Sequence, residues 1–375
     1  MPKIKCKLIT NSTSRFLQQI YTGFFLLYKN GLIDLRQVFN NEKEKKPNHR
    51  HQIRVIVNDG IKLHYDITDG YSINKKDLEE SHYYFKRSYY LKYISTFGDR
   101  KKKIFPLGLN YELYPSNIDK FALRRNFLLQ EGFRKITGII NTFDIRSKLN
   151  YKPRINIMQS LPDYHAKPKI IFMVKAFDPY DDPKRPKNKI AERIKINETR
   201  AKCIKMLRDE FGKNFYGGFY HSKFSKRNYN ELLIPDIRNS IKQNYINLLK
   251  QYPICIANSG LHGSIGWKFA EYIAFSKAII AEKMNYEVTG SLEEGKNYLE
   301  FQSPEDCVEN ALKLFKNEEL RHYLMTNNTK YYHAYLRPDS LILKTLLTAL
   351  SGQYGDPFVS GFSSNLKMLN YVNAA

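Results

Sequence analysis

The sequence predicts an α/β protein with about two domains, and three observations support this. The chain has 375 residues, which is more than a single hydrophobic core usually holds. Its hydrophobic content of 42% is ordinary for a globular protein. Short β-branched or uninterrupted apolar runs alternate with stretches of helical periodicity. This alternation is typical of a parallel sheet covered by helices.

Five runs in the first half are expected to form strands: 4–9, 33–38, 53–57, 62–67 and 104–109. A helix is expected from about 15 to 30, because capping side chains precede it and Gly31 follows it. The segment 78–87 is expected to pass from helix to strand. Asn58-Asp59-Gly60 marks a turn between the third and fourth strands.

The expected helix near the N-terminus resembles a signal sequence only superficially. The apolar run 16–28 contains Gln18, Gln19 and Thr22, has no small-residue cleavage site after it, and is too short and too polar to span a bilayer. We therefore expect a soluble, cytoplasmic protein. The widely spaced cysteines lack a Cys-x-x-Cys motif, so neither a zinc site nor a disulfide framework is indicated: Cys6, Cys203, Cys255 and Cys307.

A change of character over 150–169, where three prolines punctuate a basic stretch, predicts a crossing between domains. Strands are then expected at 170–174, 215–219, 253–257, 278–281 and 297–301. Helices are expected at 190–211, at 229–252 with a break at Pro235, after Gly266, after Ser303, from 317, and at 340–350. The predicted division is 1–155, 156–336, a last helix at 337–350 and a tail at 351–375.

The most informative stretch is 258–266, a Gly/Ser-rich loop between a buried-type strand and a helix, with Ser264 as a candidate N-cap. Such a loop is a ready anion site, because backbone N–H groups and the helix dipole both favour negative charge. The amides and Lys268 can hold phosphate, while Glu271 can accept hydrogen bonds from sugar hydroxyls. Two structural alternatives stay open: the glycines only close a tight turn, and Lys268 pairs with Glu271 along the helix.

The net charge of +24 indicates anionic partners, which include nucleotide phosphates, an acidic membrane surface and nucleic acid. The abundance of Lys, Asn, Ile and Tyr also fits a compositionally biased genome. That alternative lowers the weight of the charge as a sign of function.

The segment 258–339 resembles the C-terminal half of a nucleotide-sugar glycosyltransferase of the GT-B type. The resemblance rests on the loop, on the helix with Glu271, on the strand that ends at Glu282, and on the motif at 295–301. It is good over 169–339, and over the first half it is only a compatible order of strands and helices. The resemblance implies two Rossmann-like domains that face each other across a cleft. It also implies an acceptor site on the first domain, a donor site on the second, and a C-terminal helix that crosses back.

The same resemblance implies roles for individual residues. Glu271 is expected to hold the donor ribose, with Ser264 and Lys175 beside the diphosphate; a surface charge is the alternative for Lys175 and also for Arg200. The further donor-binding candidates are Arg200, Asn258, Gly260, His262, Gly263, Ile265, Lys268, Glu282 and Asn297. Many retaining relatives carry two glutamates separated by seven residues. Here the earlier position is Gly263, so retaining and inverting chemistry both stay open.

The expected chemistry needs no metal or other cofactor. A nucleoside diphosphate leaving group is stabilised by positioned cations and amides, and the sequence has no Asp-x-Asp triplet of the kind that holds a metal. The adjacent pair Asp181-Asp182 is interpreted as a solvated turn. An inverting enzyme needs a general base, for which Asp69, Asp66 and His64 are candidates. For each of these three, a turn-capping or surface group is the structural alternative.

The expected substrates are a nucleotide sugar and a glycan or lipid-linked acceptor in the synthesis of surface polysaccharide. In that interpretation the enzyme lies peripherally on an anionic membrane, with the lysines at 43–46 and 101–103 as contacts. Two alternatives remain. One is sugar transfer onto modified bases in DNA, which no nucleic-acid motif supports. The other is a nucleotide-sugar-binding module that lacks catalysis.

Overall fold

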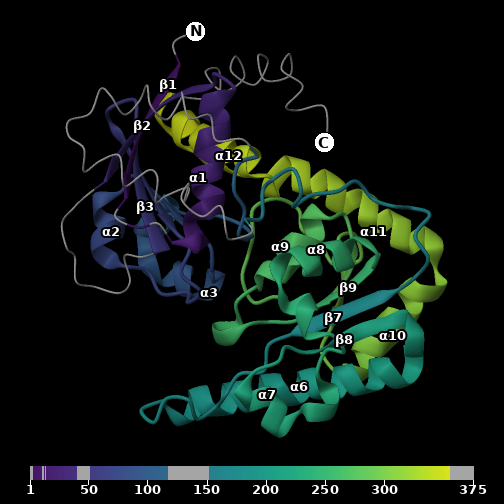
Figure 1. Ribbon diagram of the computed structural model, residues 1–375. Helices are drawn as coiled ribbons and strands as arrows, with labels where there is room; N and C mark the ends of the chain where they lie inside the picture. The colour runs from purple at the N-terminus through teal and green to yellow at the C-terminus, as the bar shows by residue number, and fades with distance from the viewer. Residues whose placement is uncertain (1–2, 11, 13, 40–50, 117–151, 355–375) are drawn as a thin grey trace. The chain divides into compact units, whose positions relative to one another are not determined.

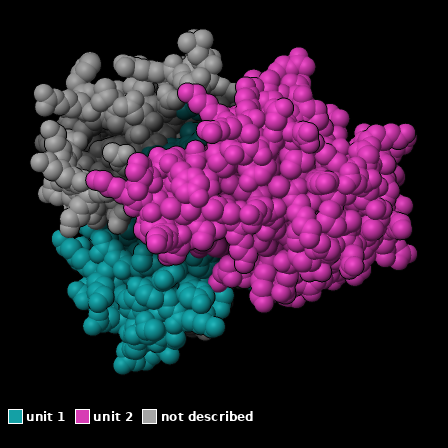
Figure 2. Space-filling model, turned by 90° about the horizontal axis from the view of Figure 1, so that it is seen from below, with its two compact units in different colours: residues 1–157, 286–290, 330–375 teal, residues 158–285, 291–329 magenta. Residues whose placement is uncertain are grey.

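The computed structural model describes residues 3–10, 12, 14–39, 51–116 and 152–354. The chain forms two compact units, coloured separately in Figure 2. Unit 1 comprises 1–157, 286–290 and 330–375, and unit 2 comprises 158–285 and 291–329. Each unit holds one sheet with helices, so the predicted α/β class is confirmed. The lysines at 43–46 and the tail beyond 354 lie outside the described residues.

The sheet of unit 1 has six strands in the order β2-β1-β3-β4-β5-β6. Their bounds are β2 (Ile33–Phe39), β1 (Ile4–Thr10), β3 (Gln52–Val57), β4 (Ile61–Asp66), β5 (Tyr83–Lys86) and β6 (Ile104–Pro106). Neighbours are parallel except at β3, which is antiparallel to β1 and to β4. The expectation of a parallel sheet is therefore wrong at this strand. The turn at 58–60 is too short for the crossover that parallel neighbours need.

Two long helices cover one face of this sheet. They are α1 (Gln18–Lys29), preceded by the 3-10 turn η1 (Arg15–Leu17), and α12 (Pro338–Tyr354), and Figure 1 shows them side by side. Both contribute to one buried apolar cluster with alternate residues of the strands, such as Leu8, Val55 and Phe85. Three shorter elements pack beside the sheet or extend its loops: α2 (Lys75–Glu80), α3 (Leu91–Ile94) and η3 (Ser95–Lys103).

The sheet of unit 2 has five strands, all parallel, in the order β11-β10-β9-β7-β8. Their bounds are β11 (Tyr298–Phe301), β10 (Ala278–Glu282), β9 (Ile254–Ala257), β7 (Ile170–Val174) and β8 (Phe215–Phe219). The chain proceeds from β7 outward to β8, then returns to β9 on the other side of β7. The order of strands therefore reverses between β7 and β9. In open α/β sheets this is the point where ligands bind, outside the carboxyl ends of the strands.

Helices lie on both faces of this second sheet. On one face α6 (Lys187–Phe211), α10 (Pro304–Lys316) and α11 (Glu318–Tyr331) share an apolar core with alternate strand residues. The opposite face is contacted by α9 (Trp267–Ala274), and α8 (Lys242–Lys250) leads into β9. The remaining short elements are η4 (Gly212–Asn214), α7 (Lys223–Asn228), η5 (Asn230–Leu232), η6 (Ile237–Ser240), η7 (Leu261–Gly263) and η8 (Tyr332–Leu336).

The helix predicted over 229–252 is reduced to α8. The preceding residues form short 3-10 turns on either side of Pro235, and the backbone N–H of Ile234 donates to the carbonyl of Phe219 at 3.0 Å. Proline and this contact with β8 together prevent a continuous helix. All four cysteines are buried free thiols. Among the helices that the structure describes, none has the length and apolarity needed to cross a membrane.

Candidate functional site

Arg200 links the two loops that leave the sheet at its switch point. From α6 its guanidinium donates to the carbonyl of Lys175, just after β7, at 2.5 Å and to the carbonyl of Ser259, just after β9, at 3.0 Å. Arg200 is buried, so the alternative of a surface charge is wrong. Burial lowers the pKa of Arg200 to about 10, although the nearby Glu282 carboxylate acts in the opposite direction. These contacts favour a positioning role for Arg200.

Other buried polar groups hold the same strand ends in place. The carboxylate of Glu282, at the end of β10, accepts from the backbone N–H of Ser259 at 2.9 Å. Asn197, one helical turn before Arg200, bonds both the N–H and the carbonyl of Phe177 at 2.9 Å and 2.6 Å. The loops after β7, β9 and β10 are thereby fixed to one another. The side chain of Lys175 remains exposed at this edge of the sheet.

The glycine-rich loop folds back on itself. The N–H of Gly260 donates to the carbonyl of Ser264 at 2.8 Å, and the N–H of Ser264 donates to Leu261 at 3.2 Å. His262 and Gly263 both have φ of 63°, in the left-handed region that glycine adopts most easily. Ser264 is buried and α9 begins later, with Gly266 as its N-cap residue, so the predicted capping role of Ser264 is wrong. Ile265 and Asn258 are partly exposed on either side of this turn.

The tip of the loop binds a carboxylate from α6. The backbone N–H of His262 donates to Oε1 of Glu192 at 2.6 Å. Oε2 of Glu192 pairs with Nζ of Lys189 at 3.0 Å, and the same Nζ lies 3.0 Å from Nδ1 of His262. Burial acts to raise the pKa of Glu192, but the hydrogen bonds from Lys189 and from the His262 amide outweigh it and hold this pKa below its ordinary value. The predicted anion loop therefore already holds one negative group.

Glu271 lies on α9 with only 2% of its surface exposed, and it forms an ion pair with Lys242 at the start of α8. Its ion pair is thus with another helix and not with Lys268. The ammonium of Lys268 instead lies 3.8 Å from the ring centroid of Tyr245 and 5.4 Å from that of Tyr220. Desolvation lowers the pKa of Lys268 to about 8, although the Glu271 carboxylate acts to raise it. The result is a compact group of two cations, one carboxylate and aromatic rings.

Asn297 is engaged elsewhere in unit 2. Its amide donates to Oδ1 of Asn328 at 3.1 Å, and its oxygen accepts from the N–H of Glu293 at 3.1 Å. Both bonds stabilise the turn before β11 and the docking of α11. The structure does not bring the side chain of Asn297 to the glycine-rich loop.

Comparisons with known proteins were made on sequence and on structure. Neither the protein-family models nor the curated proteins include a match to this chain. Among solved structures, a glycosyltransferase from Rickettsia africae is similar with a TM-score of 0.41 and 11% identity, over 90% of this chain and 82% of that one. A putative UDP-N-acetylglucosamine 2-epimerase from Listeria monocytogenes has a TM-score of 0.42 and 11% identity, over 95% and 98% of the two chains. The C-terminal domain of a group 1 glycosyl transferase from Francisella tularensis has a TM-score of 0.32 and 11% identity, over 51% and 96%.

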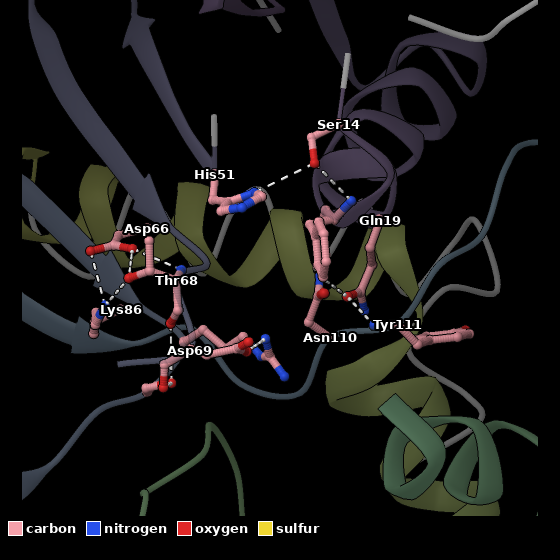
Figure 3. A network of polar contacts seen from close by, with 12 residues as sticks. Ser14, Gln19, His51, Asp66, Thr68, Asp69, Lys86, Asn110 and Tyr111 are labelled. Carbon is pink, nitrogen blue, oxygen red and sulfur yellow. Dashed lines mark hydrogen bonds and ion pairs between the residues drawn. The ribbon is translucent and has the colours of Figure 1, made fainter. Parts of the chain in front are cut away.

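In unit 1 the candidate base Asp66 lies inside a buried network at the end of β4 (Figure 3). It accepts from Tyr84 at 2.5 Å, from Lys86 at 3.0 Å, and from the hydroxyl and N–H of Thr68 at 2.6 Å and 2.9 Å. Burial acts to raise the pKa of Asp66, but Lys86 and these hydrogen bonds outweigh it and lower the pKa. A buried carboxylate with both oxygens engaged is a poor general base, so these contacts favour a structural role.

The other two candidate bases differ in accessibility. Asp69 is 51% exposed on its side chain and pairs with the buried guanidinium of Arg87 at 2.5 Å. His64 is buried and stacks on Tyr84 with ring centroids 4.6 Å apart. It also lines a cavity of about 230 Å³ between β3, β4 and α2. Of the three candidates, Asp69 therefore has by far the most exposed side chain.

Several residues of the site in unit 2 were not predicted. They are Lys189, Glu192, Tyr220, Lys242 and Tyr245. Each comes from outside the loop and the helix that follows it: from α6, from the end of β8 or from α8. The chain contains 61 basic and 37 acidic residues, so no local pattern distinguishes these charges from surface ones. Within the described ranges no three His, Cys, Asp or Glu side chains gather closely enough to hold a metal ion.

Proposed function

We propose that this chain is a GT-B glycosyltransferase that binds a nucleoside diphosphate sugar at the glycine-rich loop of unit 2. One observation carries the proposal: the loop leaves β9 at the switch point of a parallel sheet, and its amide at His262 already binds a carboxylate. Anionic ligands of open α/β sheets bind at such places. The buried carboxylate of Glu271 lies on the helix that follows the loop.

The proposed roles follow from the chemistry of the donor. The loop amides, Lys175 and Lys189 take the diphosphate and stabilise its charge as it leaves. Glu271 accepts hydrogen bonds from hydroxyls of the donor ribose, which replace its ion pair with Lys242. Such groups stabilise the leaving group without a metal or a further cofactor, and we include neither in the proposal.

The proposed acceptor is a glycan or a lipid-linked glycan in the synthesis of a surface polysaccharide. In unit 1, Asp69 is the proposed base for the acceptor hydroxyl, because its carboxylate is accessible. The net charge of +24 supports an enzyme that works beside an anionic membrane at its inner face.

A panel of nucleotide sugars tests this function. The protein is heated with UDP-, GDP- and ADP-sugars, and the melting temperature is compared with that of the free protein. A donor at about 100 times its Kd adds about 2.7 kcal/mol of stability, which gives a clear rise in melting temperature. Slow hydrolysis of the stabilising donor supports transfer chemistry. It is detected through the nucleoside diphosphate that the reaction releases. A panel in which no nucleotide changes the melting temperature contradicts the proposal.

Replacement of Glu271 by glutamine tests the proposed ribose contact. Glu271→Gln removes the charge but keeps the volume, and we expect the donor Kd to rise about 10-fold or more, because hydrogen bonds to a charged group contribute about 1.5–3 kcal/mol. Titration calorimetry measures the Kd. Circular dichroism confirms folding, because Glu271 also pairs with Lys242. Glu309→Gln, on the exposed side of α10, is the matched control and leaves the Kd unchanged. An unaltered Kd for Glu271→Gln removes this residue from the site.

A further inference from the structure

We propose that Glu192 occupies the position of a donor phosphate in the free protein, and that nucleotide binding displaces its carboxylate from the loop. This inference rests on the proposed function. On α6, Glu192 then opposes binding of the nucleotide, and the neighbouring Lys189 favours it.

The contacts of Glu192 are those that a phosphate needs. Its Oε1 accepts from the backbone N–H of His262 at 2.6 Å, and its Oε2 pairs with Nζ of Lys189 at 3.0 Å. A phosphate group presents the same kind of oxygen to the same two donors. Because the single backbone N–H of His262 is already used, the carboxylate and an incoming phosphate compete for it. The two anions also repel each other if both are present.

The geometry allows the side chain to leave without movement of the helix. The side chain of Glu192 is 22% exposed, so water can reach the carboxylate. The backbone of α6 is held nearby by Asn197 and Arg200, which bond the loops after β7 and β9. The positions of Lys189 and Glu192 relative to the loop are therefore fixed, and rotation of one side chain is sufficient. Lys189 lies 3.0 Å from Nδ1 of His262 and stays at the loop after the carboxylate has turned away.

A purely structural role for the same contacts makes the opposite prediction. If Glu192 only stabilises the loop, its removal loosens the phosphate site and weakens nucleotide binding. If Glu192 competes with phosphate, its removal strengthens binding. The sign of the change in Kd therefore separates the two roles. A variant that fails to fold cannot imitate the second result.

The test measures Kd values for UDP and GDP by titration calorimetry on the full-length protein. We expect Glu192→Gln and Glu192→Ala to bind the nucleotide about 10-fold more tightly than the unmodified protein, because a charge-assisted competitor has been removed. Lys189→Met is expected to bind about 10-fold more weakly, because it loses a cation for the diphosphate. Glu198→Gln, exposed on the same helix, is the control and keeps the original Kd.

The outcomes are distinct. Tighter binding by both Glu192 variants than by the unmodified protein supports the inference. Binding that is measurable only in these two variants supports it as well. Equal or weaker binding by both, while the unmodified protein binds, overturns the inference and leaves the proposed function standing. No nucleotide binding by any of the proteins overturns the proposed function and the inference with it.

Discussion

Buried charges in this protein have different uses, and their contacts distinguish them. Lys86 has no exposed surface and pairs with Asp66, far from the glycine-rich loop in sequence. Arg200 bonds two backbone carbonyls, whereas Glu271 pairs with a lysine on a neighbouring helix. A buried charge that loses its partner is costly, because the remaining group has already lost its water. All three contacts are therefore expected to contribute to stability, and Glu271 is in addition the proposed contact for a ligand.

Replacement of Asp66 tests the structural role. We expect Asp66→Asn to reduce the free energy of unfolding by about 3 kcal/mol or more at neutral pH, because Lys86 is left buried without its counter-charge. Urea unfolding measures the change. Asp59→Asn, which removes an exposed partner of Lys5, is the control and is expected to change stability by less than about 1 kcal/mol.

The pH dependence of the same variant follows from the lowered pKa of Asp66. A carboxyl group with a lowered folded pKa stabilises the protein fully above its ordinary value of 3.8, and this contribution is lost as the pH falls through the lower folded value. Below about pH 4 the unmodified protein should therefore lose more stability than Asp66→Asn. Equal acid sensitivity of the two proteins contradicts the assignment of this ion pair.

The sequence predicted types of residue better than it predicted their partners. It named Glu271 and Arg200 as donor-binding candidates, yet Lys242 and the two carbonyls that these residues contact come from segments up to 59 residues away. Hydrogen-bond partners at such separations depend on the strand order. The strand order was not contained in any local pattern of apolar and polar residues.

At the level of elements, the close approach of α1 and α12 depends on Gly23. A Cβ added at this position would overlap the carbonyl oxygen of Pro338 and Cγ1 of Ile342. The first of these atoms is backbone, which cannot give way as the end of a flexible side chain can. Glycine inside a helix costs about 1 kcal/mol relative to alanine, so its presence here indicates that the packing of the two helices outweighs helix propensity.

Gly23→Ala is therefore expected to destabilise the protein by about 1–3 kcal/mol, in spite of the better helix propensity of alanine, because the two helices must separate. Thermal or urea unfolding measures the change. Gly60→Ala is the control, since an added Cβ there meets only the carbonyl of Asn58 at 3.9 Å, and it should change stability by about 0.5 kcal/mol or less. A stabilised Gly23→Ala variant contradicts the packing described for α1 and α12.

The elements around the glycine-rich loop were predicted well, because each has a strong local signal. The apolar runs became β9 and β10, and the periodic stretch between them became α9.

Two predictions of elements failed for physical reasons that lie outside the local pattern. The orientation of β3 was set by a short turn with Asn58 and Asp59 in left-handed conformations. The region before α8 was set by Pro235 and by its contact with β8.

At the level of the whole molecule, the excess of positive charge predicts salt-sensitive binding to anionic surfaces. The lysines at 101–103 are exposed at the end of η3 and are the described part of the basic segments singled out in the sequence. Each lysine near an anionic membrane contributes about 1 kcal/mol, and salt screens this attraction.

Replacement of these three lysines by alanine tests the membrane interpretation. We expect retention on vesicles with anionic lipid to fall about 10-fold or more at low salt, and retention of the unmodified protein to be lost at about 0.5 M salt. Co-sedimentation with the vesicles measures the retained fraction of each protein. A matched control replaces three exposed lysines of unit 2, Lys213, Lys223 and Lys226, with the same loss of charge. If both triple variants lose retention equally, the attraction depends on total charge and not on this segment.

The interleaving of the two units has a consequence for how the chain emerges from the ribosome. Unit 1 takes its covering helix α12 from the region after 330, whereas unit 2 lies between 158 and 329 apart from its short interruption. Leu341, Ile342 and Leu346 complete the core that begins with β1. The strands of unit 1 are therefore synthesised first, but their core is completed only when α12 has been synthesised. Unit 2 begins later in the chain, yet all of its residues are synthesised before α12.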